Sequence, residues 1–202
     1  REPVASHSIF EQPHHVLAQL SWNSPKYARG HMQTHISLTY NGYTGQHYSL
    51  TMSDATNNSF NGDMRTGNSL LYIPTEEELQ VMQFKTEADR EAFAKWIDDD
   101  KYASKHRGQY ADRNSNSAAW ENHFDLHFAQ DFYYWKQRGC KLQLVADIIN
   151  VANLLNHNWG TYYSSTTYEN ILEVSEVKKA DDGSRYAVYS YLDNNKPLKK
   201  YH

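Results

Sequence analysis

The chain has 202 residues, of which 24 are acidic and 20 basic, and 39% are hydrophobic. This length can enclose one core, and the mixed charges form no basic stripe that would bind a phosphate backbone, which excludes nucleic acid as an expected partner. The mean hydropathy is -0.84, and no run of about 18 apolar residues suggests a membrane-spanning helix. The single Cys140 excludes an internal disulfide, and its position after a Gly-containing turn makes a nucleophilic role unexpected.

The aromatic content is high, with 16 Tyr, 5 Trp and 7 Phe. Aromatic side chains suit half-buried strands, and the many Asn, Ser and Thr residues suit turns. The composition therefore favours an all-β fold.

Strand alternation begins after Pro13. Residues 14–22 place Val16, Ala18, Leu20 and Trp22 on one side, and residues 31–41 repeat the pattern from Met32 to Tyr40. A link containing Pro25 and Gly30 separates the two segments, so they are predicted to form a hairpin.

Residues 42–118 are predicted to be a long and partly helical loop. Thr75 and Glu78 have the spacing of a capping box, which predicts a short helix, and a second helix is expected from Thr86, with Phe93 and Trp96 on its apolar side. The run Asp98 to Asp100 is interpreted as a solvated helix end.

A second and longer hairpin is predicted from residues 119–135 and 141–154, around Gly139. In its first strand the even positions from Trp120 to Tyr134 are mostly apolar and the odd positions mostly polar. Residues 156–202 are interpreted as a second long loop that contains a small hairpin around Asp181, Asp182 and Gly183.

The layout of these elements favours an antiparallel transmembrane β-barrel segment. Such strands need about 9 to 11 residues, alternate between lipid and lumen, and are joined by short periplasmic turns and long extracellular loops. Aromatic residues near the strand ends, where rings sit at membrane interfaces, add to the pattern. These are Trp22, Tyr40, Trp120, Phe132 and Tyr134.

Several segments also resemble TonB-dependent outer-membrane receptors, in particular the Oar-like group of Bacteroidota. The segments are 68–74, 106–114, 124–132, 142–144, 147–156 and the pair Trp159-Gly160. The stretch that begins at Leu142 and ends at Gly160 resembles the penultimate barrel strand and the start of the last extracellular loop of that group. The similarity covers about residues 16–160 and thins out beyond them.

The resemblance implies a gated importer in which a plug domain lies inside a barrel of about 22 strands. It implies as partners the remainder of the barrel and plug, a TonB energising complex, outer-membrane lipid, and in some cases a surface lipoprotein. The sequence has no plug, no TonB-contacting box and no closing strand with a terminal aromatic residue. We therefore expect a carboxy-terminal fragment of a bacterial receptor that takes up an unidentified solute.

Two sets of residues are candidates for binding that solute. Polar residues of the second hairpin would line the lumen, and aromatic residues of the two loops would form the extracellular mouth. The lumen candidates are His123, Asp125, His127, Asp131 and Asp147. The loop candidates are Tyr43, Tyr48, Trp159, Tyr162 and Tyr163.

No cofactor, metal ligand or catalytic residue is expected. His123, Asp125 and His127 could suit zinc by residue type, but positions two apart on a strand lie about 7 Å apart. The oxygen-rich loop from Asp54 to Asp63 fails the EF-hand pattern, because Asn68 stands where a bidentate Glu is needed. The absence of a phosphate loop and nucleophile elbow argues against an enzyme.

Two alternatives stay open from the sequence. One is a soluble all-β module that binds a glycan or another ligand through its tyrosine-rich loops. The other is a metallohydrolase that uses His123 and His127, which lacks a general base at useful spacing.

Overall fold

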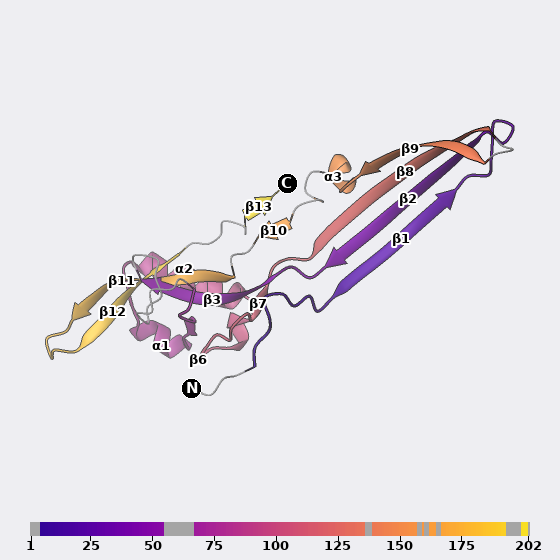
Figure 1. Ribbon diagram of the computed structural model, residues 1–202. Helices are drawn as coiled ribbons and strands as arrows, with labels where there is room; N and C mark the ends of the chain where they lie inside the picture. Colours follow the sequence, from indigo (N-terminus) through magenta and orange to yellow (C-terminus); the bar gives the residue numbers. More distant parts are fainter. Residues whose placement is uncertain are drawn as a thin grey trace. The chain divides into compact units, whose positions relative to one another are not determined.

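The computed structural model describes residues 5–54, 67–135, 139–156, 159, 162–164, 167–192 and 199–201 (Figure 1). Strands predominate in this part of the chain, which confirms the predicted β-rich class. The chain divides into two compact units. We call Gln12–Gly45 with Ala119–Tyr163 and Lys200–His202 the long-strand unit, and Arg1–Glu11 with Gln46–Ala118 and Ser164–Lys199 the mixed unit.

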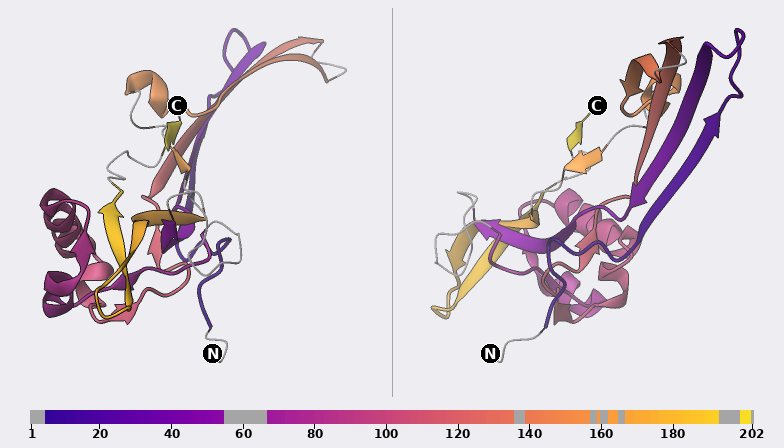
Figure 2. Two further views of the ribbon diagram at one scale, coloured as in Figure 1. Left: turned by 90° about the vertical axis from the view of Figure 1, so that its left-hand side faces the viewer. Right: turned by 45° about the vertical axis from the view of Figure 1, so that its right-hand side comes forward.

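The long-strand unit is built on four strands, β1 (His15–Asn23), β2 (Met32–Tyr43), β8 (Glu121–Trp135) and β9 (Cys140–Ile148). They lie in the order β1-β2-β8-β9, and every neighbouring pair is antiparallel. Both predicted hairpins are confirmed, and β2 pairs with β8 to join them into one sheet. Figure 2 shows the strands curving together with a common twist. Among the described residues this sheet is open and does not close into a barrel.

The last of these strands is shorter than predicted. It ends at Ile148 instead of residue 154, and the helical turn α3 (Ala152–Leu155) follows it. The reason lies at Asn150, which adopts a left-handed φ of 58°, a conformation that Asn tolerates better than most residues. The Asp125 carboxylate accepts a 2.8 Å hydrogen bond from the Asn150 backbone N–H, which stabilises this bend. The apolar pattern continued past the bend and therefore concealed it.

The strand register separates the side chains into two faces, because directly paired residues share a face. We call one the apolar face. Its members are Val16, Ala18, Leu20 and Trp22 on β1; Met32, Thr34, Ile36, Leu38, Tyr40 and Gly42 on β2; Asn122, Phe124, Leu126, Phe128, Gln130 and Phe132 on β8; and Leu142, Leu144, Ala146 and Ile148 on β9. The opposite side, with His35, Ser37, Asp125, His127, Asp131 and Asp147 among its members, is the polar face.

The mixed unit is built on a five-stranded sheet in the order β5-β12-β11-β3-β7. Its strands are β3 (His47–Asp54), β5 (Gln83–Phe84), β7 (Asn116–Ser117), β11 (Tyr168–Lys179) and β12 (Arg185–Tyr191). The hairpin of β11 and β12 confirms the prediction around residues 181–183. β3 pairs in parallel with β11, and β5 in parallel with β12. The segments predicted as two separate loops thus share one sheet.

Short elements complete the description. β4 (Tyr72–Ile73) pairs with β6 (Gln109–Tyr110), and β10 (Tyr162–Ser164) pairs with β13 (Lys199–Tyr201). The helices are α1 (Glu76–Val81), α2 (Glu87–Asp99) and the 3₁₀ turn η1 (Ala103–Lys105). No helix in the described ranges is long and apolar enough to span a membrane.

Both predicted helix starts are confirmed. The Thr75 hydroxyl accepts from the Glu78 backbone N–H at 3.2 Å, and the Glu78 carboxylate accepts from the Thr75 backbone N–H at 2.9 Å, which completes the capping box. Thr86 caps α2 by accepting from the Asp89 backbone N–H.

The core of the mixed unit lies between its helices and its sheet (Figure 2). Phe93 and Ile97 of α2 and Leu50 of β3 are at most 1% exposed. Phe93 stacks on Trp96 and packs at a tilt against Phe84. A core of this kind holds the mixed unit together through burial of apolar surface.

Candidate functional site

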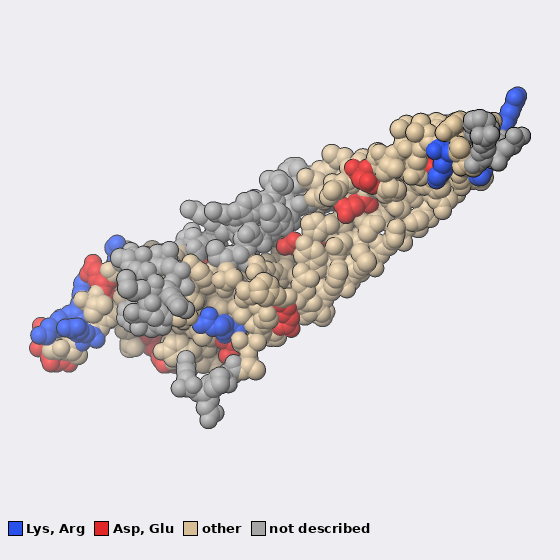
Figure 3. Space-filling view, in the orientation of Figure 1, with Lys and Arg blue, Asp and Glu red and all other residues tan. Residues whose placement is uncertain are grey.

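The apolar face of the long-strand sheet is exposed in many places. Leu20 is 74% exposed, Trp22 55%, Leu142 57% and Leu144 58%. Figure 3 shows acidic side chains along these strands, and the register places every Asp and Glu of the sheet (Glu121, Asp125, Asp131 and Asp147) on the opposite, polar face. Soluble proteins seldom expose so continuous an apolar surface, so this face requires an apolar partner or solvent.

Polar groups on the apolar face satisfy one another at one end of the sheet. The Gln130 side-chain carbonyl accepts hydrogen bonds from the Thr34 hydroxyl at 2.7 Å and from the Tyr27 hydroxyl at 2.8 Å. Tyr27 belongs to the link between β1 and β2, in which Ala28, Arg29 and Gly30 all have positive φ angles. The tight link thus brings a phenol over the polar pair, and Gln130 is only 8% exposed.

An aromatic cluster occupies the other end of the apolar face. The Asn122 side-chain carbonyl accepts from the Tyr40 hydroxyl at 2.8 Å and from the Trp120 indole N–H at 3.1 Å. Tyr40 also packs on Phe124 with ring centroids 4.8 Å apart. Rings with one apolar side and one hydrogen-bonded group suit a boundary between an apolar and an aqueous medium.

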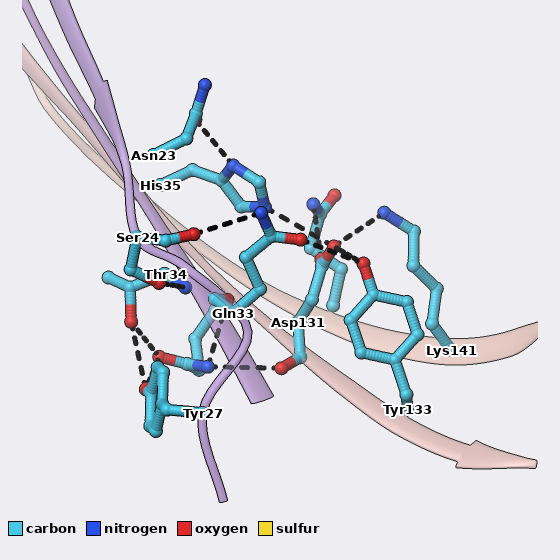
Figure 4. Close-up of polar contacts among 11 residues, drawn as sticks. Asn23, Ser24, Tyr27, Gln33, Thr34, His35, Asp131, Tyr133 and Lys141 are labelled. Atoms are coloured by element: carbon cyan, nitrogen blue, oxygen red, sulfur yellow. Dashed lines mark hydrogen bonds and ion pairs between the residues drawn. The ribbon is translucent and has the colours of Figure 1, made fainter. Parts of the chain in front are cut away.

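On the polar face, Asp131 is the centre of a hydrogen-bonded cluster near the short links (Figure 4). Its carboxylate accepts from the Lys141 ammonium at 2.8 Å, the Gln143 amide at 2.7 Å and the Tyr133 hydroxyl at 3.2 Å. His35 of β2 makes a longer contact of 3.4 Å. Asp131 is 1% exposed, so this carboxylate is surrounded by donors from three adjacent strands.

These contacts fix the alignment of β2, β8 and β9. A buried carboxylate is costly to desolvate unless it is paired and hydrogen-bonded, and a slip of one residue would move it to the opposite face of the sheet. The nearby amide of Gln130 donates to the backbone carbonyls of Gln33 and Asp131 at 3.0 Å, which adds a further contact between β2 and β8.

The other lumen candidates share the polar face with Asp131 but bind separate neighbours. His127 donates to the Asp147 carboxylate at 2.5 Å, and Asp125 holds the Asn150 backbone. His123 lies 3.2 Å from the Tyr43 hydroxyl, and the two rings stack. The structure therefore brings these residues to one side of the sheet without gathering them around one point.

The loop candidates have different environments. Tyr43 lies at the end of β2 against His123, whereas Tyr48 lies in β3 and packs against the core of the mixed unit. Burial, together with the charge of Glu169, raises the pKa of the Tyr48 phenol to about 12. Trp159 is 54% exposed, and the side chains of Tyr162 and Tyr163 lie outside the described residues. Of the described candidates, Trp159 offers the most ring surface.

The residues that resemble metal ligands only by type lie in separate environments. His123, Asp125 and His127 form no potential metal-binding group, and most of the oxygen-rich loop lies outside the described residues. Asp98 pairs with Arg107 at 2.7 Å, and Asp100 accepts from the backbone N–H groups of Tyr102 and Ala103. The acidic run thus makes local contacts at the end of α2.

Sequence reasoning missed the residues around Asp131, because their proximity depends on the pairing of three strands. It also missed a group formed by His7, Glu11 and His47, whose ligand atoms all lie within 4.8 Å of one another. The pair His7 and Glu11, four residues apart, was a weak local signal, and no spacing rule connects it with His47.

The chain matches no protein-family model, and no curated protein or solved structure matches it at a significant level.

Proposed function

We propose that the long-strand sheet is part of the barrel wall of a TonB-dependent outer-membrane receptor, and that the mixed unit belongs to its extracellular side. The observation that carries the proposal is the exposed apolar face running across all four strands. In a bilayer such a face contacts lipid and the opposite face lines the lumen.

Strand length supports this assignment. The shortest strands of the sheet have 9 residues and the longest has 15, and at a rise of about 3.4 Å per residue even 9 residues extend about 30 Å. A tilted strand needs about 9 to 11 residues to cross the hydrocarbon core, so each of the four strands is long enough.

The connections of the sheet support it as well. β1 and β2 are joined by residues 24–31, and β8 and β9 by residues 136–139, both at the same end of the antiparallel sheet. The connection from β2 to β8 leaves the opposite end and contains most of the mixed unit. Short turns on one side and a long connection on the other are typical of outer-membrane barrels.

The ends of the apolar face fit the same assignment. The cluster of Tyr40, Trp120 and Asn122 lies at the end from which the long connection leaves. The hydrogen-bonded group of Tyr27, Thr34 and Gln130 lies near the short links. Leu38 and Leu126 lie between them, as expected for an apolar band bounded by two polar or aromatic girdles.

In this proposal the protein acts in transport and not in catalysis. The polar face of the sheet would form part of the lumen wall, and the contacts of Asp131 would keep its strands in register. The solute would meet exposed extracellular groups such as Trp159 before it reaches His127 and Asp147 on the polar face. The rest of the barrel, a plug and a TonB complex would be required for uptake.

A soluble ligand-binding module fits the same observations less well. In a soluble sandwich a second layer covers the apolar face of each sheet. Leu20 and Leu144 would then be buried, whereas both are more than half exposed. The exposed apolar face thus favours the membrane assignment.

Epitope insertion into the complete encoded protein tests the orientation. One tag is placed at Gly183 in the turn between β11 and β12, and a matched tag at Gly30 in the link between β1 and β2. We expect antibody to bind the first tag on intact cells and the second only after the outer membrane is permeabilised. Recovery of both tagged proteins in the soluble fraction, or surface labelling at Gly30 alone, would contradict the proposal.

A further inference from the structure

We propose that His7, Glu11 and His47 bind a divalent transition-metal ion of the zinc class. One ring nitrogen from each histidine and one carboxylate oxygen lie within 4.8 Å of one another, all in the mixed unit. Two imidazoles and a carboxylate are a donor set that zinc accepts, with a fourth position left for water.

His47 is already oriented as a metal ligand. Its Nδ1 lies 3.2 Å from the backbone carbonyl of Asn114. Because a carbonyl only accepts, Nδ1 is the donor, and in the neutral ring the lone pair is then on Nε2. A histidine that binds metal commonly donates its other N–H to a backbone carbonyl in this way. The contact thus selects the tautomer that leaves Nε2 available.

The Nε2 atom of His47 has no protein partner. The residue is 7% exposed, and this atom is buried without a hydrogen-bond partner among the described residues. Buried polar atoms are nearly always satisfied, because an unmade bond leaves the cost of desolvation uncompensated. A metal ion bound to Nε2 would remove this defect.

Asn114 positions both histidines. Besides accepting from His47, it donates from its side-chain amide to the His7 backbone carbonyl at 2.6 Å. Ser49 holds Asn114 in turn, since its hydroxyl accepts from the Asn114 backbone N–H at 2.9 Å and donates to the Asn114 side-chain carbonyl at 3.1 Å. The segment containing His7 is therefore anchored beside His47 by the same residue.

The third ligand is adjacent to the first. His7 Nδ1 donates to the Glu11 carboxylate at 2.8 Å, and the rings of His7 and His47 are parallel with centroids 5.1 Å apart. Tetrahedral zinc with bonds of about 2.0 to 2.1 Å needs donor atoms roughly 3.3 Å apart. Ligand atoms that lie up to 4.8 Å apart must therefore move closer when metal binds. The His7 side chain is 60% exposed, so it can turn with little loss of packing.

Metal binding would connect the segment before β1 to the first residue of β3. Such a cross-link stabilises the folded mixed unit, because only the folded chain brings the three ligands together. All three ligands belong to the mixed unit, so the metal site is independent of the proposed function of the long-strand sheet.

Titration of the purified chain with Co²⁺ and Zn²⁺ tests the proposal. We expect one Co²⁺ per chain, with the visible absorption of a low-symmetry, four-coordinate site, displaced by Zn²⁺. His7→Ala and His47→Gln are each expected to weaken binding at least 100-fold. His31→Ala, which removes an exposed histidine from the link between β1 and β2, should bind Co²⁺ as the unaltered chain does.

His7→Ala keeps the test valid if the buried His47 substitution disturbs folding, because His7 is largely exposed. Circular dichroism and proteolysis establish that the variant is folded before titration. The proposal is overturned if the unaltered chain binds no Co²⁺, or if folded His7→Ala binds it with unchanged affinity and spectrum.

Discussion

Replacement of Phe93 by Ala tests whether the mixed unit has its own core. Phe93 is fully buried and lies at ring-centroid distances of 5.9 Å from Trp96 and 6.2 Å from Tyr191. Loss of a buried Phe side chain costs about 3 to 5 kcal/mol, and the lost aromatic contacts put this site in the upper part of that range. We expect destabilisation by about 4 kcal/mol, a large fraction of the stability of an ordinary domain.

Hydrogen exchange measured by mass spectrometry on the full chain resolves where stability is lost. Peptides from α2 and β11 should lose protection by about three orders of magnitude, since each 1.4 kcal/mol is a factor of ten. Peptides from β8 should change little, because they belong to the other unit. Val81→Ala, at a position 73% exposed, is the matched control and should have no effect beyond about 0.5 kcal/mol.

Unchanged protection of α2 in Phe93→Ala would refute the core assignment. Equal loss in α2 and β8 would instead refute the division into two units that unfold separately.

Three further substitutions test other contacts. Burial raises the pKa of the Glu169 carboxyl, so the folded state holds this proton more tightly than the unfolded state does. The stability of the fold therefore falls as pH rises above about 4.5 toward the folded pKa. In urea unfolding, the stability gained by Glu169→Gln should be near zero at pH 4 and larger at pH 7. Asp131→Ala removes a carboxylate that accepts several hydrogen bonds. It should destabilise the long-strand sheet by about 2 to 3 kcal/mol, measured by urea unfolding in detergent. The control Asp147→Ala, at a side chain 62% exposed, should cost under about 1 kcal/mol. Thr75→Ala removes the capping box of α1 and should cost about 1 kcal/mol, with faster exchange of the first α1 amides, while Thr75→Ser should be close to neutral.

Local patterns predicted the long strands and the helix starts well. Alternation along residues 14–22 and 119–135 is strong because each strand has one apolar and one polar side. Thr75 and Glu78 act within one turn of chain, so their spacing alone identified the helix start. Features that depend on near neighbours in sequence were therefore accessible.

Pairing between distant segments could not be predicted in the same way. Leu50 of β3 pairs with Glu169 of β11 across more than a hundred residues, and nothing in either segment selects the other. The donors around Asp131 and the group of His7, Glu11 and His47 depend on similar pairing. Their residue types were visible in the sequence, but their proximity was not.

Site-directed spin labelling of β8 in the encoded protein, reconstituted in lipid bilayers, tests the proposed membrane assignment most directly. With Cys140 replaced by Ser, single cysteines are placed at Phe124, Leu126 and Phe128 on the apolar face and at His123, Asp125 and His127 on the polar face. Accessibility to oxygen, which concentrates in lipid, should be high for the first three labels, and accessibility to a water-soluble nickel chelate should be high for the second three. Equal accessibility of both rows, or the opposite alternation, would contradict a lipid-facing apolar face.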